Sequence, residues 1–126
     1  MAGKLIADQI EHSTTGSLDT SYVVNGSAKA WANLNGLTFG LRNSNNISSA
    51  VDDGTGDYTF NFSNSMSAAD YSVQAGEGRT ASTDFSFGFT NIINLTASSF
   101  NAQTGTAGGS NIYFATAQLS VQGDLA

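Results

Sequence analysis

Few residues in this sequence could take part in nucleophilic catalysis. The chain has one histidine, His12, and no cysteine. A catalytic serine needs a base within hydrogen-bond reach, and His12 lies in a stretch with few apolar neighbours to hold it in place. With 17 serines among 126 residues, a serine close to an acid arises by chance. We therefore expect no catalytic triad and no enzyme activity.

Carboxylates offer a second route to chemistry, because glycoside hydrolysis uses a pair of them. The chain has 10 acidic residues, and Asp52, Asp53 and Asp57 lie in or beside the glycine-containing segment 53–56. Aspartate is common in tight turns because its side chain bonds to the nearby backbone. The segment is only faintly similar to a calcium loop, since it lacks the alternating acidic ligands and the distal glutamate. We predict a turn here and no metal site; a glycan hydrolase is a distant alternative.

The glycine-rich segment 105–109 lacks the features of a phosphate-binding loop. Neither a Lys-Ser or Lys-Thr pair nor a helical pattern follows it, whereas a P-loop has both. We therefore expect no nucleotide and no other cofactor.

The polar and aromatic side chains favour binding to a partner over catalysis. Trp31, the only tryptophan, has two interpretations: a platform on which a sugar ring stacks, or an ordinary core or interface tryptophan. Loops around 36–45, 76–82 and 103–110 are expected to point outward. The candidate partner or glycan contacts are Trp31, Arg42, Asn43, Asn45, Arg79 and Asn111.

The composition describes one folded domain with a polar surface. Asn, Ser, Thr and Gly fill 56 of the 126 positions, and 13 aromatic residues supply a core. The four cations lie far apart in a chain of net charge −6, which argues against nucleic acid as a partner. No apolar run approaches the roughly 18 residues of a membrane helix. Since Asp8 comes before any signal-peptide core, we expect neither membrane insertion nor export by a cleaved signal.

Alternation of apolar and polar residues predicts that the elements are mostly strands. The clearest unit is a hairpin over 46–64 whose turn is Asp53-Gly54-Thr55-Gly56. Pairing position 52 with 57 places Val51 beside Tyr58 and Ile47 beside Phe62, so that the large residues share one buried face.

Further strands are predicted on the same grounds. Phe85, Phe87 and Phe89 alternate with small residues over 84–90, and 92–96 follows after a bend near Asn91. The run 111–121 has apolar residues on both faces, which indicates a central strand or one packed against a second chain. Weaker strands are predicted at 21–24, 27–33, 38–41 and 71–75. The predicted fold is an all-β, compact antiparallel sandwich, with a jelly-roll-like arrangement as one form of it.

The first twenty residues differ from the rest because Leu5, Ile6, Ile10 and Leu18 are isolated apolar positions without an obvious partner strand. One interpretation is a frayed terminus. The other, which we adopt, is an extended N-terminal arm over 1–20 that contacts other subunits or a larger particle, followed by a single β domain over 21–126.

Several segments in a fixed order resemble one family. Residues 29–36 (KAWANLNG) are followed by NNISS at 45–49, DGTGDYTFNF at 53–62 and MSAADY at 66–71, after lead-ins at 5–10 and 22–26. This order is similar to a small β domain of tailed-bacteriophage virion proteins, often of the tail-fibre-like kind. The resemblance covers roughly residues 4 to 75, and the last third of the chain matches no pattern of that family.

The resemblance implies a non-catalytic structural protein exposed on the virion surface, made in the bacterial cytoplasm and commonly a homotrimer. A tail-fibre-like module for host attachment is the expected role, and a capsid decoration protein that stabilises the head is the alternative. The implied partners are its own copies, other virion proteins and a host surface glycan. The resemblance supplies no catalytic, cofactor-binding or metal-binding residues.

Overall fold

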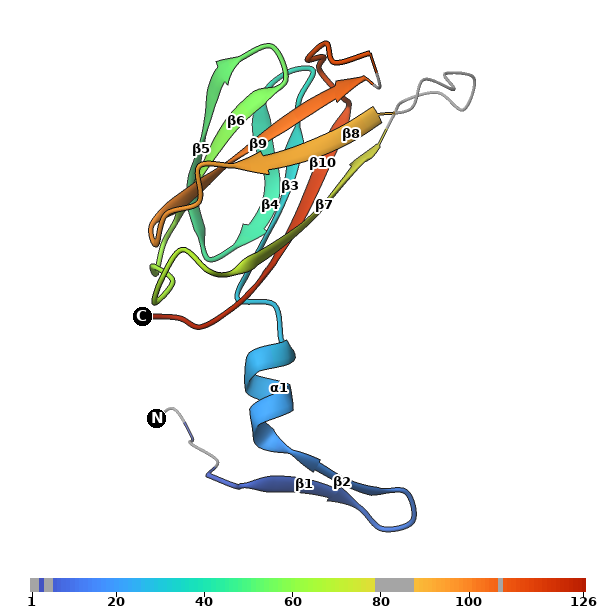
Figure 1. The fold of residues 1–126 in the computed structure, drawn as a ribbon, viewed down its shortest axis with the longest axis vertical. Helices are drawn as coiled ribbons and strands as arrows, with labels where there is room; N and C mark the ends of the chain where they lie inside the picture. The colour runs from blue at the N-terminus through green and yellow to red at the C-terminus, as the bar shows by residue number, and fades with distance from the viewer. Residues whose placement is uncertain (1–2, 4–5, 79–87, 107) are drawn as a thin grey trace.

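The computed structural model describes residues 3, 6–78, 88–106 and 108–126 (Figure 1). A small N-terminal part precedes the main body, and Figure 1 shows it standing below that body. The elements are β1 (Gln9–His12), β2 (Gly16–Asp19), α1 (Thr20–Gly26), β3 (Ala30–Asn35), β4 (Gly40–Asn45), β5 (Ile47–Gly54), β6 (Asp57–Phe62), β7 (Ser72–Gly78), β8 (Gly88–Ile93), β9 (Ser99–Thr106) and β10 (Thr116–Gln122).

Two four-stranded antiparallel sheets pack face to face, which confirms the all-β sandwich. One sheet has the order β4-β3-β10-β7 and the other β5-β6-β9-β8. The first and last strands of the sandwich, β3 and β10, are paired in the middle of their sheet. Three hairpins, β3-β4, β5-β6 and β8-β9, each stay within one sheet. The other four connections, β4-β5, β6-β7, β7-β8 and β9-β10, cross from one sheet to the other.

The predicted hairpin is β5-β6, but its register is only partly as predicted. Ile47 pairs with Phe62 as expected, whereas Val51 pairs with Thr59 and Asp52 with Tyr58. Two irregularities, between residues 47 and 49 and between 52 and 54, shift the pairing. Val51 is therefore 44% exposed on the outer face and does not join the core. A bulge of one residue moves a side chain to the opposite face of a strand, which explains the difference.

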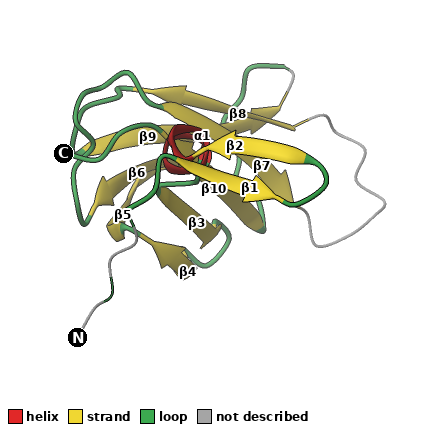
Figure 2. Ribbon diagram, turned by 90° about the horizontal axis from the view of Figure 1, so that it is seen from below, coloured by secondary structure: helices red, strands yellow, loops and turns green. Residues whose placement is uncertain are grey.

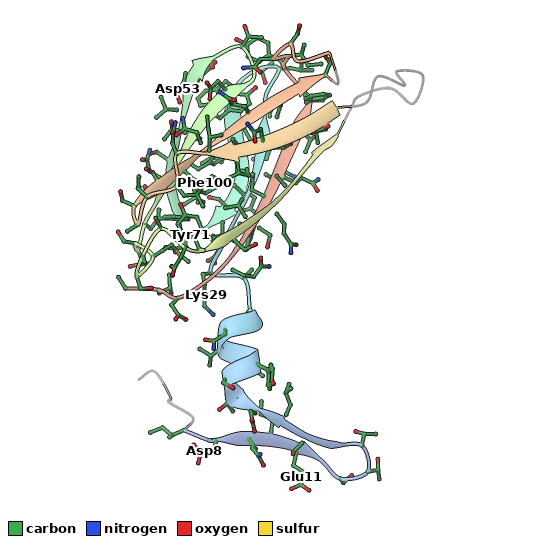
Figure 3. All side chains as sticks on the ribbon, viewed as in Figure 1. Asp8, Glu11, Lys29, Asp53, Tyr71 and Phe100 are labelled. Carbon is green, nitrogen blue, oxygen red and sulfur yellow. The ribbon has the colours of Figure 1, made fainter. Side chains whose placement is uncertain are left out.

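Aromatic rings from one sheet fill the centre of the sandwich. Every second residue of β6 and β9 is buried, including Phe60, Phe62 and Phe100. The Phe100 ring centroid lies 5.3 Å from that of Phe60 and 5.6 Å from that of Phe62. Tyr71 closes the cluster, 5.4 Å from Phe62 in an edge-on arrangement. Figure 3 labels Tyr71 and Phe100 on the sandwich. Such ring pairs stabilise a core beyond the area they bury.

The facing sheet contributes small and aliphatic residues to the same core. Its buried side chains are Ala30, Ala32 and Leu34 of β3 and Ala117, Leu119 and Val121 of β10. The prediction of a central strand in the run 111–121 is confirmed, because β10 lies between β3 and β7. The strand is shorter than predicted and begins at Thr116.

Strand β9 was not predicted, although it is central in its sheet. Its buried positions are Phe100, Ala102, Thr104 and Gly105, so that three of the four are small or polar and the apolar alternation is weak. The separate strand predicted over 92–96 is wrong, since β8 runs without a break through Asn91 and ends at Ile93.

The prediction of a strand at 21–24 is also wrong. Tyr22, Val23 and Val24 have high strand propensity, but they lie in helix α1. The other weak strands are present with shifted bounds, as β3, β4 and β7. The predicted strand over 84–90 lies partly outside the described residues: 88–90 belong to β8, and Phe85 and Phe87 are not described.

Removing the Phe100 ring tests the aromatic core. The side chain is 0% exposed, and its loss leaves a cavity between the sheets. We expect Phe100→Ala to lower the free energy of unfolding by about 3–5 kcal/mol, measured by chemical denaturation. Val51→Ala is the control, because Val51 is 44% exposed on the outer face of β5 and a loss below about 1.5 kcal/mol is expected. Equal losses for the two variants would contradict the assignment of the core.

Gly56 in the β5-β6 turn is required by space as well as by conformation. Its φ is +64°, and a Cβ at this position would lie 2.5 Å from the Ile112 carbonyl oxygen and 2.6 Å from that of Thr104. Gly56→Ala should therefore destabilise the protein by more than about 2 kcal/mol. Gly40→Ala on β4 is the matched control, since a Cβ there meets nothing within 4 Å; thermal unfolding should show little change or a slight gain. A stable Gly56→Ala variant would show that the turn has been placed wrongly.

Candidate functional site

The first of two candidate surfaces is the N-terminal module, which we define as residues 6–26, comprising β1, β2 and α1. Strands β1 and β2 pair with each other, with Ile10 opposite Leu18 and His12 opposite Gly16. The φ of Gly16 is +106°, a backbone conformation that glycine adopts without strain. Within the arm expected over 1–20, residues 9–19 form a hairpin, and the described segment outside the sandwich includes the helix and continues to Gly26.

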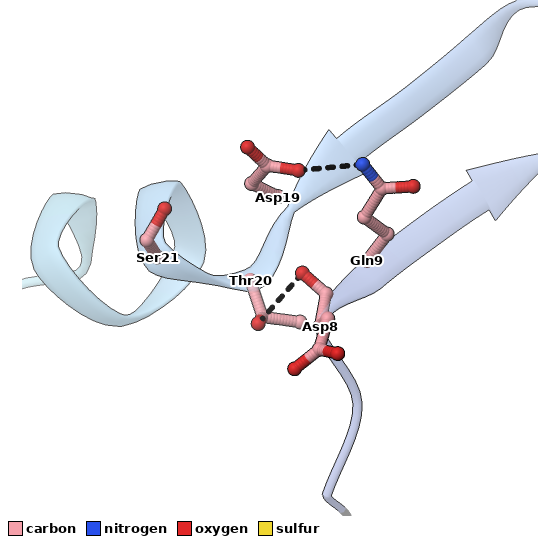
Figure 4. A pocket seen from close by; sticks show the side chains of 5 residues that line it. All are labelled: Asp8, Gln9, Asp19, Thr20 and Ser21. Atoms are coloured by element: carbon pink, nitrogen blue, oxygen red, sulfur yellow. Dashed lines mark hydrogen bonds between the residues drawn. The ribbon is translucent and has the colours of Figure 1, made fainter.

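Hydrogen bonds join the hairpin to the start of the helix. The Thr20 hydroxyl donates to the Ala7 carbonyl at 2.7 Å, and the Thr20 amide donates to the Asp8 carbonyl at 2.9 Å. The Gln9 side-chain amide donates to the Asp19 carboxylate at 2.8 Å (Figure 4). An open polar hollow lies at this junction, lined by Asp8, Gln9, Asp19, Thr20 and Ser21. The Gln9–Asp19 bond and the bonds from Thr20 to the Ala7 and Asp8 carbonyls cross this junction, so they hold hairpin and helix together.

Helix α1 buries none of its residues. It has seven residues, and its N-cap residue Asp19 makes no side-chain capping bond. An isolated helix below about 12 residues is marginal in water, and so is a lone two-stranded hairpin. The N-terminal module therefore has little intrinsic stability.

Large apolar side chains of the N-terminal module are exposed in the single chain. Their exposed fractions run from 42% for Val23 to 79% for Ile6, and the set comprises Ile6, Ile10, Leu18, Tyr22, Val23 and Val24. Covering each of these side chains would be worth on the order of 1–2 kcal/mol. Clustered exposed apolar residues mark an interaction surface.

A short connection links the module to the sandwich. The Ser27 amide donates to the Val23 carbonyl at 3.2 Å and ends the helix, and the Lys29 amide donates to the Val121 carbonyl at 2.7 Å. The Lys29 ammonium group donates to the Val24 carbonyl and to the Ser27 hydroxyl. Figure 2, viewed from the side of the module, shows the hairpin crossing beneath the sandwich with the helix end-on.

The second candidate surface is the amide face, the outer face of the β4-β3-β10-β7 sheet. Because the residues in alternation with it are buried, its members follow from the registers of the four strands. They are Trp31, Asn33, Asn35, Asn43, Asn45, Ser72, Gln74, Thr116, Gln118, Ser120 and Gln122. Seven of these eleven side chains are amides, and Trp31, 37% exposed, is the one aromatic among them.

Four of the predicted contact residues belong together on this face. Trp31 pairs with Asn45, and Asn33 pairs with Asn43. Arg42 lies at the irregularity of β4 and reaches across β3, where its guanidinium donates to the Asn33 side-chain oxygen at 3.2 Å and to the Thr116 hydroxyl at 2.9 Å. A further bond at 2.7 Å goes to the Ala115 carbonyl. Arg42 is therefore held against its own sheet.

The other two predicted contacts are not placed on the amide face. Asn111 lies in the connection between β9 and β10, where it forms an isolated bridge with Gly105. Arg79 lies outside the described residues. Sequence reasoning missed Gln74 and Gln118, although the alternation of polar and apolar residues over 116–122 could have identified Gln118 as outward-facing.

The carboxylates around the β5-β6 turn hold the turn. Asp52 accepts a hydrogen bond from the Gly54 amide at 3.1 Å, and Asp53 accepts one from the Thr59 hydroxyl. Asp57 accepts one from the Gln103 side-chain amide at 3.0 Å. The described residues hold no group of three or more His, Cys, Asp or Glu side chains arranged for a metal ion. None of the described helices has the length and apolarity to cross a membrane.

Comparisons with known proteins give no relative for this chain. No protein-family model matches it, and neither a curated protein nor a solved structure is significantly similar.

Two core tyrosines have displaced pKa values. Burial, aided by the charge of Asp52 and by Tyr113, raises the pKa of Tyr58 from 10.0 to about 12. Burial also raises the pKa of Tyr71, whose hydroxyl donates to the Thr96 and Ser99 carbonyls. Both changes move the hydroxyls further from neutral pH, so they are consequences of packing and do not prepare an acid or base for catalysis.

The raised pKa of Tyr58 predicts an alkaline transition. The folded state keeps the proton that the unfolded chain loses near pH 10, so the free energy of unfolding should fall between pH 10 and about 12 and be independent of this group below pH 10. Tyr58→Phe should weaken that fall, measured by denaturant unfolding at pH 8 and 11.5. Identical pH dependence in the native protein and in Tyr58→Phe would refute the shift.

Proposed function

We propose that this chain is a non-catalytic structural protein of a tailed-bacteriophage particle, a tail-fibre-like module on the virion surface that takes part in host attachment. The observation that carries the proposal is the N-terminal module, whose large apolar side chains have no cover in the single chain. Such a module is stable only when another surface packs on it. The sandwich is the part presented outward.

Copies of the same chain are the first partners of the module, in a homotrimer. Its exposed apolar residues lie on both the hairpin and the helix, so that association can bury several side chains from each copy at once. In an oligomer with closed symmetry, the exposed apolar surface of every copy is covered in the same way. Other virion proteins would hold the same end of the oligomer, and the chain would then be found on the particle after synthesis in the host cytoplasm.

The resemblance of residues 4 to 75 to virion β domains is the reason for proposing a bacteriophage particle as the location of this chain. Abundant Asn, Ser, Thr and Gly with no cysteine suits a β protein that folds in the cytoplasm and later works outside the cell. The acids around the β5-β6 turn bond to their own turn and strands, which supports a binding role over hydrolysis.

Polar substitutions in α1 test the module. We expect the variant Tyr22→Gln/Val24→Gln to lose self-association in sedimentation equilibrium, because these side chains are 69% and 58% exposed and available to neighbouring copies. Circular dichroism should show an unchanged sandwich. Val51→Gln is the matched control, since Val51 is also exposed but lies on β5. A monomeric native protein, or a double variant that associates as strongly as the native chain, would refute self-association by the module.

Immunogold labelling of purified particles, with copy counting by quantitative mass spectrometry, tests the virion role. Label confined to the tail supports the attachment module. Label spread over the shell would replace it by a capsid decoration protein, and particles without label would overturn both assignments.

A further inference from the structure

One row of side chains crosses all four strands of the amide face. The registers place Trp31 between Asn45 on β4 and Ser120 on β10, and they place Gln74 of β7 beyond Ser120. Adjacent strands lie about 4.8 Å apart, so the row is roughly 14 Å long. The next row along the sheet, Asn43, Asn33 and Gln118, is parallel to it. The face therefore offers a regular polar grid around one aromatic ring.

Several amides of this grid are free to bind a ligand. Within the described part of the chain, the side chains of Asn45, Gln74 and Gln118 have no hydrogen-bond partner. Asn33 accepts from Arg42 through its side-chain oxygen, which leaves its NH₂ group as a donor. Each amide presents both donors and an acceptor, which is the combination that vicinal hydroxyl groups require.

Charge is nearly absent from the amide face. Among the described acids, Glu77 is the one on the strands of this sheet; it pairs with Ala117 on the inner side and accepts a hydrogen bond from Thr90 of β8 at 2.7 Å. The single cation, Arg42, already donates to Asn33, Thr116 and the backbone. An anionic ligand would find no free counter-charge, and a protein partner would find little apolar area besides Trp31.

These observations point to one ligand class: we infer that the amide face binds a neutral oligosaccharide, with the exposed part of the Trp31 ring packed against the C–H face of a pyranose. The amides of Asn45, in the same row as Trp31, and of Gln118, in the next row, bond to its hydroxyls. The inference deepens the proposed function, on which it rests, because it names the chemistry that the attachment module recognises. It also moves the contact from the loops to a sheet face.

The single tryptophan makes the inference directly measurable. Excitation of Trp31 in the full-length protein reports on this face alone, because the chain has no other tryptophan. The probes are soluble oligomers of glucose, mannose, galactose, N-acetylglucosamine and rhamnose, with alginate oligomers as the anionic comparison. We expect a saturable change of emission with at least one neutral series and none with alginate.

Variants then locate the site by isothermal titration calorimetry. Asn45→Ala and Gln118→Ala should each weaken binding about five- to tenfold, as expected for a lost hydrogen bond, and Trp31→Ala should abolish it. Asn91→Ala is the matched control, because Asn91 is an exposed amide on β8 in the other sheet. Circular dichroism of each variant excludes unfolding as the cause.

Three results would overturn the inference: no neutral series binds the native protein, alginate alone binds it, or the variants of the amide face bind as the native chain does. An emission change that depends only on protein concentration would identify the face as an interface between copies instead, and would equally refute a glycan site. Each of these outcomes leaves the particle labelling and the self-association of the module unaffected, so the two proposals fail separately.

Discussion

The alternation of side chains along β6 and β9 is the constraint on which the rest of the structure depends. Antiparallel pairing places Phe60 directly opposite Phe100, and both rings are fully buried. The residues that alternate with the buried ones along β6 and β9 must then face outward. There the two strands bond to each other through side chains: Asn101 donates to Thr59, and Gln103 to Asp57. One face of the sheet becomes part of the core, and the other becomes a hydrogen-bonded polar surface. A one-residue shift in the pairing of β6 with β9 would exchange the two sets of side chains, so the register is strongly specified.

The same constraint explains why the only tryptophan lies outside. The rings of β6 and β9 fill the interior, and β3 therefore contributes the small residues Ala30 and Ala32 on that side. Trp31, between them, is directed to the outer face, where its neighbours in register are Asn45 and Ser120. Large residues on one sheet thus require small ones on the other, and a close-packed interior has no room for a further indole.

The sequence predicts those elements in which the alternation of apolar residues and the position of turn residues indicate the same structure. The β5-β6 hairpin has both signals and is therefore predicted, but the bulges that place Val51 on the outer face cannot be recognised from the apolar alternation. Strand β9 was missed because its buried positions include Ala102, which lies opposite Tyr58 of β6, and Thr104, whose hydroxyl donates to the Ile112 carbonyl, and neither is buried through its own hydrophobicity. Helix α1 was misassigned because Val23 and Val24 favour strands locally, whereas the hairpin before them is bonded to Thr20 and starts the helix.

For the candidate site, the sequence could name Trp31, Asn43 and Asn45 but could not place them in two adjacent rows of one sheet face, since register is a property of paired strands. The arrangement also links the two surfaces. Trp31 lies two residues after Lys29, which joins the N-terminal module to the sandwich. Under the proposed self-association, each copy would therefore present its amide face close to the assembled modules. A single neutral sugar offers few charge-assisted contacts, and its affinity for one face would be weak. Simultaneous engagement of several faces can raise the overall affinity by roughly 10²–10⁴ without new contacts, and under the two proposals that gain would make association through the module part of recognition.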